Sequence, residues 1–437
     1  MYNGISIEGL GTPVVLLANP GFVRDAQSAA SNKGMPVIRI LPLNVACEST
    51  VAADIEAGTA EAMPGILEML TKPLTSQEKS PKWSTEKPRR IAFKGNYEDV
   101  NRFYYRSGWT DGLPIFPPTE EAVAEMMTGT DLPADHVVAK VIPRRGKATV
   151  EKIAINAVMA GALPTHMPVL IAAIESLADP KTRFDTFEVS TGSWAPFFAI
   201  NGPIRDQIHI NYGSGALSPG DIANAAIGRA VGLIVKNIGG ARKGIEDMGV
   251  IGNPSKYTLV IGENEEDSPW EPLHVERGFQ KDDNTLTVFF PNSYMQAVPT
   301  ETSAEGIARA MQNMNPWSMS AFIVIPSHAK ILSDAGWTKE KLKEFILKKV
   351  KSPIGAYLGR EDEDEAASED ILSQPPAAVD TDTLLVLVAG GPGAWTGLLR
   401  SVGGIENDFV TVKIRLPHNW DKLVKKYKNI VPTYARY

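Results

Sequence analysis

The chain has 437 residues, 43% of them hydrophobic and 22% charged, and its 51 acidic residues outnumber 44 basic ones to give a net charge of −7. This length and composition are typical of a globular protein with two or three domains. The acidic balance argues against nucleic-acid binding, which needs a clustered basic face. A single cysteine, Cys47, rules out an intrachain disulfide and a zinc site built from several thiolates.

No targeting or membrane segment is expected. Residues 1–11 lack the basic stretch and apolar run of a signal peptide. The most apolar long window, Ile153–Ile174, contains Pro164 and Pro168 and reads as buried helices rather than a membrane span. The sequence therefore predicts a cytoplasmic protein without membrane contact.

Residues 1–75 predict a small, incomplete Rossmann-like unit. Such a unit normally opens with a strand and a loop before its first helix, and both are missing here. We expect another chain to supply them, or the start to have been lost. The expected elements are the tail of a helix at Ile5–Gly11, strands at Thr12–Ala18 and Pro36–Leu41, a helix at Phe22–Lys33 closed by Gly34, and a mostly helical stretch at Thr50–Leu70 with breaks near Gly58 and Pro64.

The rest of the chain divides into a large body and a short last unit. Residues 76–96 are a linker rich in Lys, Ser, Thr and Pro, and 97–358 form the main α/β domain. Residues 359–382 are an acidic connector, because blocks of like charge usually stay solvated. Residues 383–437 are expected to form a C-terminal α/β segment that packs on the main domain or completes it. Its Gly-rich turn at 389–397 resembles a dinucleotide loop only weakly.

The main body combines helices and strands. In the best-defined helix, Ser218 is the expected N-cap, Pro219 the first helical residue and Gly239-Gly240 the end. Its many small residues imply close approach of a ligand or, more simply, tight packing. The other expected elements are helices at Thr149–Ala160 and Thr165–Ala178, strands at Phe197–Ile200, Tyr257–Ile261, Leu286–Phe290, Ala321–Ile325 and Thr383–Val388, then a short helix and a strand at Phe409–Ile414.

The densest polar stretch, Glu263–Arg277, follows an expected strand, where open α/β proteins place ligands. His274 and Glu276 alternate on what we expect to be extended chain, and therefore point to the same side. A histidine beside a carboxylate suits acid–base catalysis, with Glu266 and His209 as further catalytic candidates. His274 and Glu276 are also candidate ligands of a divalent metal. Arg277 is a candidate for substrate binding. The alternative is a solvated loop with a structural histidine.

Two further loops carry candidate substrate-binding residues. The turn at residues 188–196, before the strand expected at Phe197–Ile200, offers hydroxyl and backbone N–H groups that suit a carboxylate or phosphate. An ordinary turn has the same composition. The loop 209–220 leads into a helix start, which favours an anion. The candidates are Ser190, Thr191, Ser193 and Asn201 around the turn, Asn211 in the loop, and Asn156 in a helix.

Several long stretches resemble the UGSC family of (seleno)proteins, across nearly the whole chain: Trp109–Pro118, Ala148–Gly161, Asn201–Pro203, Ser268–Gly278, Glu8–Val15 and Phe22–Gln27. The Cys- or Sec-Gly-Ser-Cys motif that names this family implies thiol or selenol chemistry. The motif would lie in the loop before the helix that ends at Glu8, ahead of residue 1, and Thr191–Trp194 has neither cysteine. The resemblance therefore implies a separate small subunit that contributes the missing strand and cysteines.

The leading hypothesis is an enzyme, or its large subunit, that acts on a small anionic substrate by redox or carbon–heteroatom (C–S type) bond chemistry. It would be an oxidoreductase or a lyase in a homo- or hetero-oligomer, with a thiol supplied by a partner and a divalent metal as candidate cofactor. A metal- or acid/base-dependent hydro-lyase or hydrolase without a thiol, and a non-catalytic scaffold subunit, are the alternatives. The enzymatic hypotheses expect the three loops to share one cavity.

Overall fold

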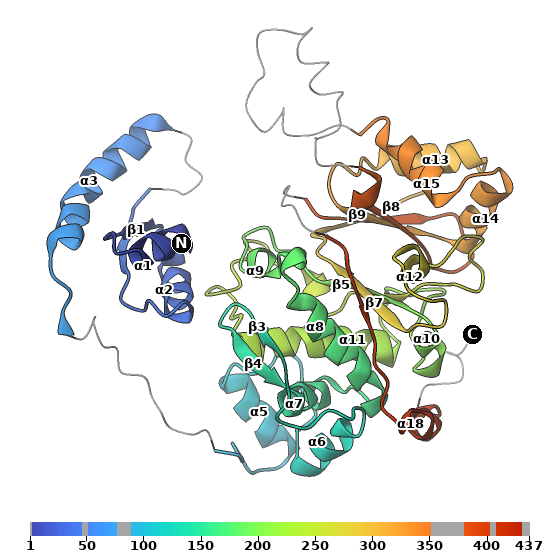
Figure 1. Ribbon diagram of the computed structural model, residues 1–437, viewed down its shortest axis with the longest axis horizontal. Coiled ribbons are helices and arrows are strands. Elements are labelled where there is room, and N and C mark those ends of the chain that lie inside the picture. The colour runs from blue at the N-terminus through green and yellow to red at the C-terminus, as the bar shows by residue number, and fades with distance from the viewer. Residues whose placement is uncertain (1, 46–50, 77–88, 351–379, 403–407, 431–437) are drawn as a thin grey trace, which may run out of the picture.

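The computed structural model describes residues 2–45, 51–76, 89–350, 380–402 and 408–430. Helices and mixed sheets make up these ranges, so the predicted α/β class is correct. Two four-stranded sheets form the main body, and two-stranded sheets lie in the first unit and in a hairpin (Figure 1). Cys47 and the acidic stretch 359–379 lie outside the described residues.

The first unit places two short parallel strands among three helices. Val15 pairs with Arg39 and Ala18 with Pro42. The helix at 52–71 runs through Gly58 and Pro64 without the expected breaks, because the alanine-rich residues around them favour helix strongly enough to offset one missing hydrogen bond. The elements are α1 (Tyr2–Gly9), β1 (Val15–Ala18), α2 (Val23–Asn32), β2 (Arg39–Pro42) and α3 (Ala52–Thr71).

One buried carboxylate joins the first unit to the main body. Glu246 accepts a hydrogen bond from Ser28 of α2 at 2.8 Å and pairs with Arg144 at 2.7 Å and Arg242 at 2.6 Å. Burial opposes the charge of Glu246, but the Arg242 and Ser28 hydrogen bonds prevail and lower its pKa to about 2. Burial near this carboxylate raises the pKa of Asp25 to about 6.

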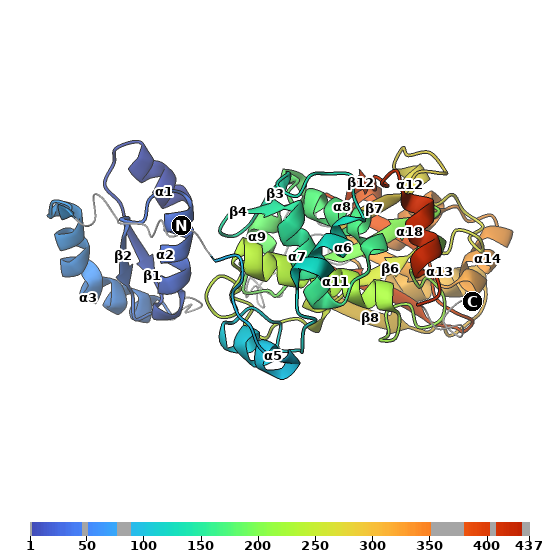
Figure 2. The same ribbon diagram turned by 90° about the horizontal axis from the view of Figure 1, so that it is seen from below.

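The main body is built in four layers, helices–sheet–sheet–helices. Along β5 (Phe197–Asn201), Phe197 and Ala199 face the other four-stranded sheet, called the second sheet below. Phe198 and Ile200 face the helices α7 (Val150–Ala160), α8 (Met167–Leu177) and α11 (Ile222–Ile234). The far face of the second sheet is covered by the helices α13 (Ala304–Asn313), α14 (Pro326–Asp334) and α15 (Lys339–Leu347). All five residues of β5 are buried, because each face of its sheet is covered. Figures 1 and 2 show the helices on the two outer sides.

The sheets are mixed, with strand orders β12-β7-β5-β6 and β10-β9-β11-β8. β5 and β6 are parallel, whereas β7 runs antiparallel to β5 and to β12. The strands are β6 (Val260–Gly262), β7 (Thr285–Phe289), β8 (Ser293–Ala297), β9 (Ser320–Val324), β10 (Leu384–Val388), β11 (Thr396–Arg400) and β12 (Val410–Lys413), beside the hairpin of β3 (Val137–Val141) and β4 (Gly146–Thr149).

Helix α7 is capped as predicted, because the Thr149 side chain accepts a hydrogen bond from Lys152 N. The longer helices of the main body are α5 (Tyr97–Arg106), α6 (Glu120–Met127), α7 (Val150–Ala160), α8 (Met167–Leu177), α11 (Ile222–Ile234), α13 (Ala304–Asn313), α14 (Pro326–Asp334), α15 (Lys339–Leu347) and α18 (Trp420–Tyr427), and one-turn helices are α9 (Phe184–Phe187), α10 (Ile204–Gln207) and α12 (Leu273–Glu276).

Two predictions at glycine-rich turns were wrong. Helix α11 begins at Ile222 with Asp221 as the N-cap residue, not at Ser218, because Pro219 and Gly220 lie in a turn where Gly220 has φ +142°. The turn after β10 leads directly into strand β11 rather than a short helix, because Leu398 and Leu399 fill opposite faces of the second sheet. No dinucleotide-type turn into a helix is therefore formed there.

The small residues of α11 accommodate protein backbone. A Cβ atom on Gly228 would lie 2.6 Å from Thr258 Cα and 2.3 Å from Thr258 Oγ1. We expect Gly228→Ala to lower the free energy of unfolding by about 1–3 kcal/mol, because overpacking outweighs the helix preference of alanine. Urea denaturation would measure this, with Ala225→Gly on the exposed face as the control for helix preference alone. A gain in stability from Gly228→Ala would contradict the close packing.

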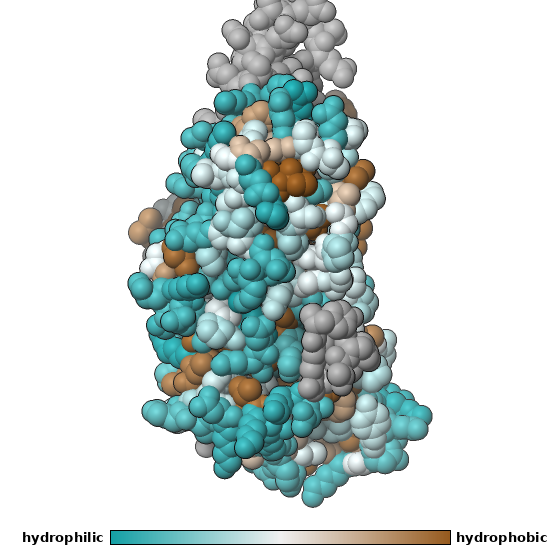
Figure 3. All heavy atoms as spheres, turned by 90° about the vertical axis from the view of Figure 1, so that its right-hand side faces the viewer, coloured by the Kyte–Doolittle hydropathy of each residue, from teal (hydrophilic) through white to brown (hydrophobic). Residues whose placement is uncertain are grey.

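The apolar window Ile153–Ile174 lies in α7 and α8, inside the main body. Within the described residues, no helix combines the length and apolar character needed to cross a membrane. The face of the molecule on the α14 side is mainly hydrophilic, with small separated hydrophobic areas (Figure 3). This face thus lacks, among its coloured residues, the continuous apolar patch that marks large interfaces.

Candidate functional site

The carboxyl ends of the parallel strands β5 and β6 meet beside the acidic loop. Ile200 pairs with Gly262, and Glu263 N donates to Ile200 O at 3.1 Å, so Asn201 and Glu263 leave the sheet at the same edge. Neither side chain is exposed to solvent. The edge is the kind of place where α/β sheets hold ligands.

Glu265 is the centre of a hydrogen-bond network at this edge. Its Oε1 accepts from Gly202 N at 2.8 Å and from Asn201 Nδ2 at 3.0 Å, and lies 3.1 Å from Arg205 Nε. Because Asn201 Nδ2 also donates to Glu263 Oε2 at 2.6 Å, one amide bridges two carboxylates. The orientation of the Asn201 amide follows from these acceptors, since only its NH₂ group can donate.

Arg205 connects this network to the surface. Its side chain is only 2% exposed, whereas the side chain of Glu266 is 53% exposed. The two Nη atoms of Arg205 donate hydrogen bonds to the Glu266 carboxylate at 2.9 and 3.2 Å. Burial would raise the pKa of Glu266, but the hydrogen bonds and charge of Arg205 hold it below its usual value. Tyr212 stacks 5.0 Å from the guanidinium. A bidentate carboxylate thus already occupies the outer side of Arg205.

A second ionic pair closes the inner side. Glu263 Oε2 accepts from Leu273 N at 2.7 Å, and Glu263 Oε1 lies 3.6 Å from Lys339 Nζ. Lys339 also pairs with Glu276 at 2.7 Å. Burial raises the pKa of Glu276 although the Lys339 charge opposes the rise. Lys339 therefore shares its charge between two carboxylates.

His274 lies on helix α12, not on extended chain as predicted, because the residues after Pro272 close one helical turn. Its ring is fully buried, and Nε2 lies 3.1 Å from Lys281 O. A carbonyl oxygen only accepts, so Nε2 carries the hydrogen and the lone pair is on Nδ1 when the ring is neutral. Nδ1 faces Glu265 Oε1 at 3.9 Å, whereas Glu276 turns to Lys339. The predicted His274–Glu276 pair is therefore not formed.

Four buried atoms of this cluster have no hydrogen-bond partner among the described residues. Asn201 and Thr285 are opposite each other on β5 and β7. A buried polar atom without a hydrogen-bond partner costs about 1–3 kcal/mol. Where several such atoms occur together, we expect a polar ligand group or an added proton to satisfy them. The atoms are Asn201 Oδ1, Glu263 Oε1, His274 Nδ1 and Thr285 Oγ1.

Comparisons with known proteins do not assign this cluster. No family model, curated protein or solved structure matches this chain. The chemistry of the cluster therefore rests on its own atoms: nitrogen and oxygen groups suited to proton transfer, and a guanidinium suited to an anion.

The loop 209–220 does reach this cluster. Asn211 O accepts from Gly262 N at 3.2 Å, and Tyr212 O accepts from Gly390 N at 2.8 Å. The Asn211 side chain donates to Asp221 at 2.8 Å and braces the turn before α11. His209 follows α10 with a left-handed φ of 58°. The loop thus shapes the backbone next to β6.

The turn that holds Ser190, Thr191 and Ser193, called the hydroxyl turn, does not reach the cluster, because it precedes β5 and lies at the opposite end of that strand. Thr191 O accepts from Val250 N at 3.1 Å, and Ser193 Oγ accepts from Gly252 N at 3.1 Å. Ser190 Oγ accepts from Gly192 N within the turn. The expectation that all three loops meet at one place was therefore wrong for Ser190, Thr191 and Ser193.

Two other predicted residues also have different neighbours. Asn156 Oδ1 accepts from Asn237 at 2.8 Å, near the end of α11 remote from Asn211. Arg277 donates to Thr411 Oγ1 at 2.6 Å and to Phe409 O, and so fastens β12. Both side chains serve as structural ties between elements.

No metal site is formed by the predicted ligands. Across the residues that the structure describes, no three or more His, Cys, Asp or Glu side chains are grouped to hold one ion. Glu276 is engaged by Lys339, away from His274 Nδ1. The pair His274 and Glu276 therefore does not provide the expected coordination.

Sequence reasoning missed Arg205, Lys339 and Thr285. Arg205 lies two residues after Asn201-Gly-Pro, and this proximity was a signal in the sequence. Lys339 lies 63 residues beyond Glu276, and nothing in the sequence linked the two. Glu263 and Glu265 were inside the predicted acidic loop but were not singled out. Glu263 is fully buried and the Glu265 side chain is 11% exposed, whereas the Glu266 side chain is 53% exposed.

Proposed function

We propose that this protein is an acid–base enzyme that acts on a small carboxylate or phosphate, with a lyase or hydrolase type of reaction centred on His274 and Glu265. The observation that carries the proposal is the unpartnered His274 Nδ1, held 3.9 Å from a carboxylate by the Nε2 contact to Lys281 O. A ring oriented through one nitrogen leaves the other to take or deliver a proton.

Arg205 would bind the anionic part of the substrate. Glu266 is the one half-exposed carboxylate on its guanidinium, so a substrate carboxylate or phosphate would replace it with the same forked geometry. Glu265 would stay on the inner side, where its carboxylate faces His274 Nδ1 at 3.9 Å. Proton transfer at Nδ1 would then take place beside the bound anion, with Asn201 and Thr285 offering polar atoms to the reacting group.

Turnover of a panel of small carboxylates and phosphates, followed by proton NMR, tests this function. We expect His274→Gln to reduce the rate by about 100-fold or more, as removal of a general acid–base does. His418→Gln is the matched control, because His418 is exposed and pairs with Asp131 at the surface. Equal rates for His274→Gln and the original protein, with both folded by circular dichroism, would contradict the proposal.

A thiol-assisted redox or carbon–sulfur reaction in a complex is the second candidate. The two-stranded parallel sheet of β1 and β2 favours it, because such a small pair normally needs further strands to bury its faces. A partner strand would complete the proposed Rossmann-like unit, in line with the resemblance to the UGSC family. Tagged protein purified from its own cells would carry a small cysteine-containing chain. Full activity of the chain alone would contradict this candidate.

A cytoplasmic location and a homo- or hetero-oligomeric state belong to the same proposal. A scaffold role would be supported instead if replacing both His274 and Glu276 left the activity of the assembled complex unchanged.

A further inference from the structure

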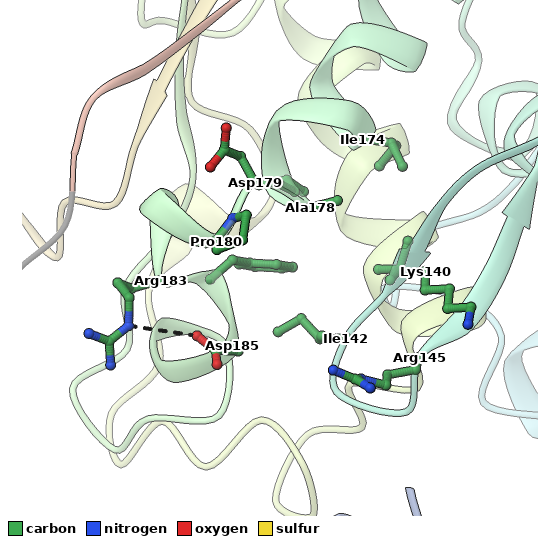
Figure 4. A pocket seen from close by; sticks show the side chains of 12 residues that line it. Lys140, Ile142, Arg145, Ile174, Ala178, Asp179, Pro180, Arg183 and Asp185 are labelled. Atoms are coloured by element: carbon green, nitrogen blue, oxygen red, sulfur yellow. Dashed lines mark ion pairs between the residues drawn. The ribbon is translucent and has the colours of Figure 1, made fainter. Parts of the chain in front are cut away.

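A pocket of about 480 Å³ lies away from the His274 cluster, between the β3–β4 hairpin, the end of α8 and helix α9. Its volume is within the range that holds small molecules. No residue of the His274 cluster lines it. Figure 4 shows the hairpin on one side and the segment from Asp179 to Asp185 on the other.

The floor of the pocket is apolar. Ile174, Leu177 and Phe184 are at most 4% exposed, and the Phe184 ring stacks on Phe290 with ring centres 5.4 Å apart. Ile142 and Pro180 add to this surface from the two walls. A ligand with a flat or branched apolar body would therefore bury its surface here.

The rim carries unbalanced positive charge. Arg183 lies 3.9 Å from Asp185 on one wall, which partly neutralises both (Figure 4). Lys140 and Arg145 on the hairpin form no ion pair with any residue in the described ranges, and Arg145 extends toward the pocket (Figure 4). Asp179 is engaged at the opposite wall, where it accepts from Lys181 N at 2.9 Å. The hairpin side therefore attracts an anion.

Both arginines of the rim adopt a backbone conformation that favours glycine. Arg145 has φ 55° and Arg183 has φ 52°. A non-glycine residue in this region costs stability, and such positions occur often at binding sites. Both positions therefore carry a long cationic side chain on a backbone that glycine would fit better.

We propose that this pocket binds a small amphipathic anion, with its apolar body on the Phe184 floor and its carboxylate, sulfonate or phosphate on Arg145 and Lys140. The site is independent of the proposed reaction centre, so its occupancy does not depend on the acid–base function.

Fluorescence titration with 8-anilinonaphthalene-1-sulfonate tests the site, and N-phenyl-1-naphthylamine is the uncharged matched probe. We expect saturable binding of one sulfonate probe per chain, with weaker binding of the uncharged one. Arg145→Gly should weaken only the sulfonate probe, by about three- to fivefold, as expected for one exposed ion pair. Its melting temperature should be unchanged or higher, because glycine relieves the left-handed backbone.

Ala178→Trp should fill the pocket from its exposed wall and weaken both probes by at least about tenfold. Lys147→Gln, on the same hairpin but outside the pocket lining, should change binding by less than about twofold. The site is disproved by an absence of saturable binding in the folded protein, or by unchanged binding to Ala178→Trp. Equal weakening of both probes by Arg145→Gly would disprove the anion contact.

Discussion

Replacing Arg205 by methionine is expected to lower the free energy of unfolding by about 3–5 kcal/mol, the usual cost of removing one partner from a buried ionic network. Arg205 is 2% exposed, donates to Gly202 O at 2.9 Å and to Glu263 O, and neutralises Glu265. Methionine fills similar space but leaves these acceptors without a donor. Urea unfolding monitored by tryptophan fluorescence would measure the loss.

Arg102→Met is the matched control for Arg205→Met. Arg102 is 65% exposed and pairs with Glu98 on the surface of α5, so its replacement should cost less than about 1 kcal/mol. Arg205→Lys keeps the charge but loses the forked geometry, and we expect an intermediate loss. A loss below about 1 kcal/mol for Arg205→Met would show that the network contributes little to folding.

Removing the charge of Glu188 is expected to make the protein more stable at high pH. Glu188 is buried directly after helix α9, with Lys256 Nζ 3.8 Å away, and Lys256 also pairs with Asp247 at 2.8 Å. Burial raises the pKa of Glu188 from 4.5 to about 7, although the Lys256 charge opposes the rise. The folded protein therefore holds this proton more tightly than the unfolded chain.

The direction of the pH effect follows from that difference. Below pH 4.5 Glu188 is protonated in both states, and its contribution to stability is fully present. Between pH 4.5 and about 7 the unfolded chain releases the proton first, so stability falls as pH rises, by about 3 kcal/mol in total.

Unfolding by urea at pH 5 and pH 8 would measure the effect. Glu188→Gln should be more stable than the original protein at pH 8 by up to that amount, and nearly equal at pH 5. Glu151→Gln is the control at a carboxylate that pairs with Arg90 at the surface. A stability difference between Glu188→Gln and the original protein that does not change with pH would contradict the raised pKa.

The residues of the site illustrate how far local sequence reasoning reaches. The acidic loop was found because its charges stand together directly after an apolar strand, and His274 was found with it. Arg205 and Lys339 were not found, because each contacts a residue of the acidic loop that is 58 or more residues away in the sequence. Helical and strand periodicities report neighbours within about one turn or one alternate residue, and carry no information about such contacts.

The sequence by itself determined the α/β class, the cap of α7 at Thr149, and the buried strands β5, β7, β9 and β10, because apolar runs and capping side chains act over a few residues. Only the tertiary structure decided that the turn after β10 leads into a strand, that Leu273–Glu276 closes into a helix, and that the hydroxyl turn lies at the far end of β5. These choices depend on which faces two stacked sheets must cover, and burial of those faces outweighs the local preference of each segment.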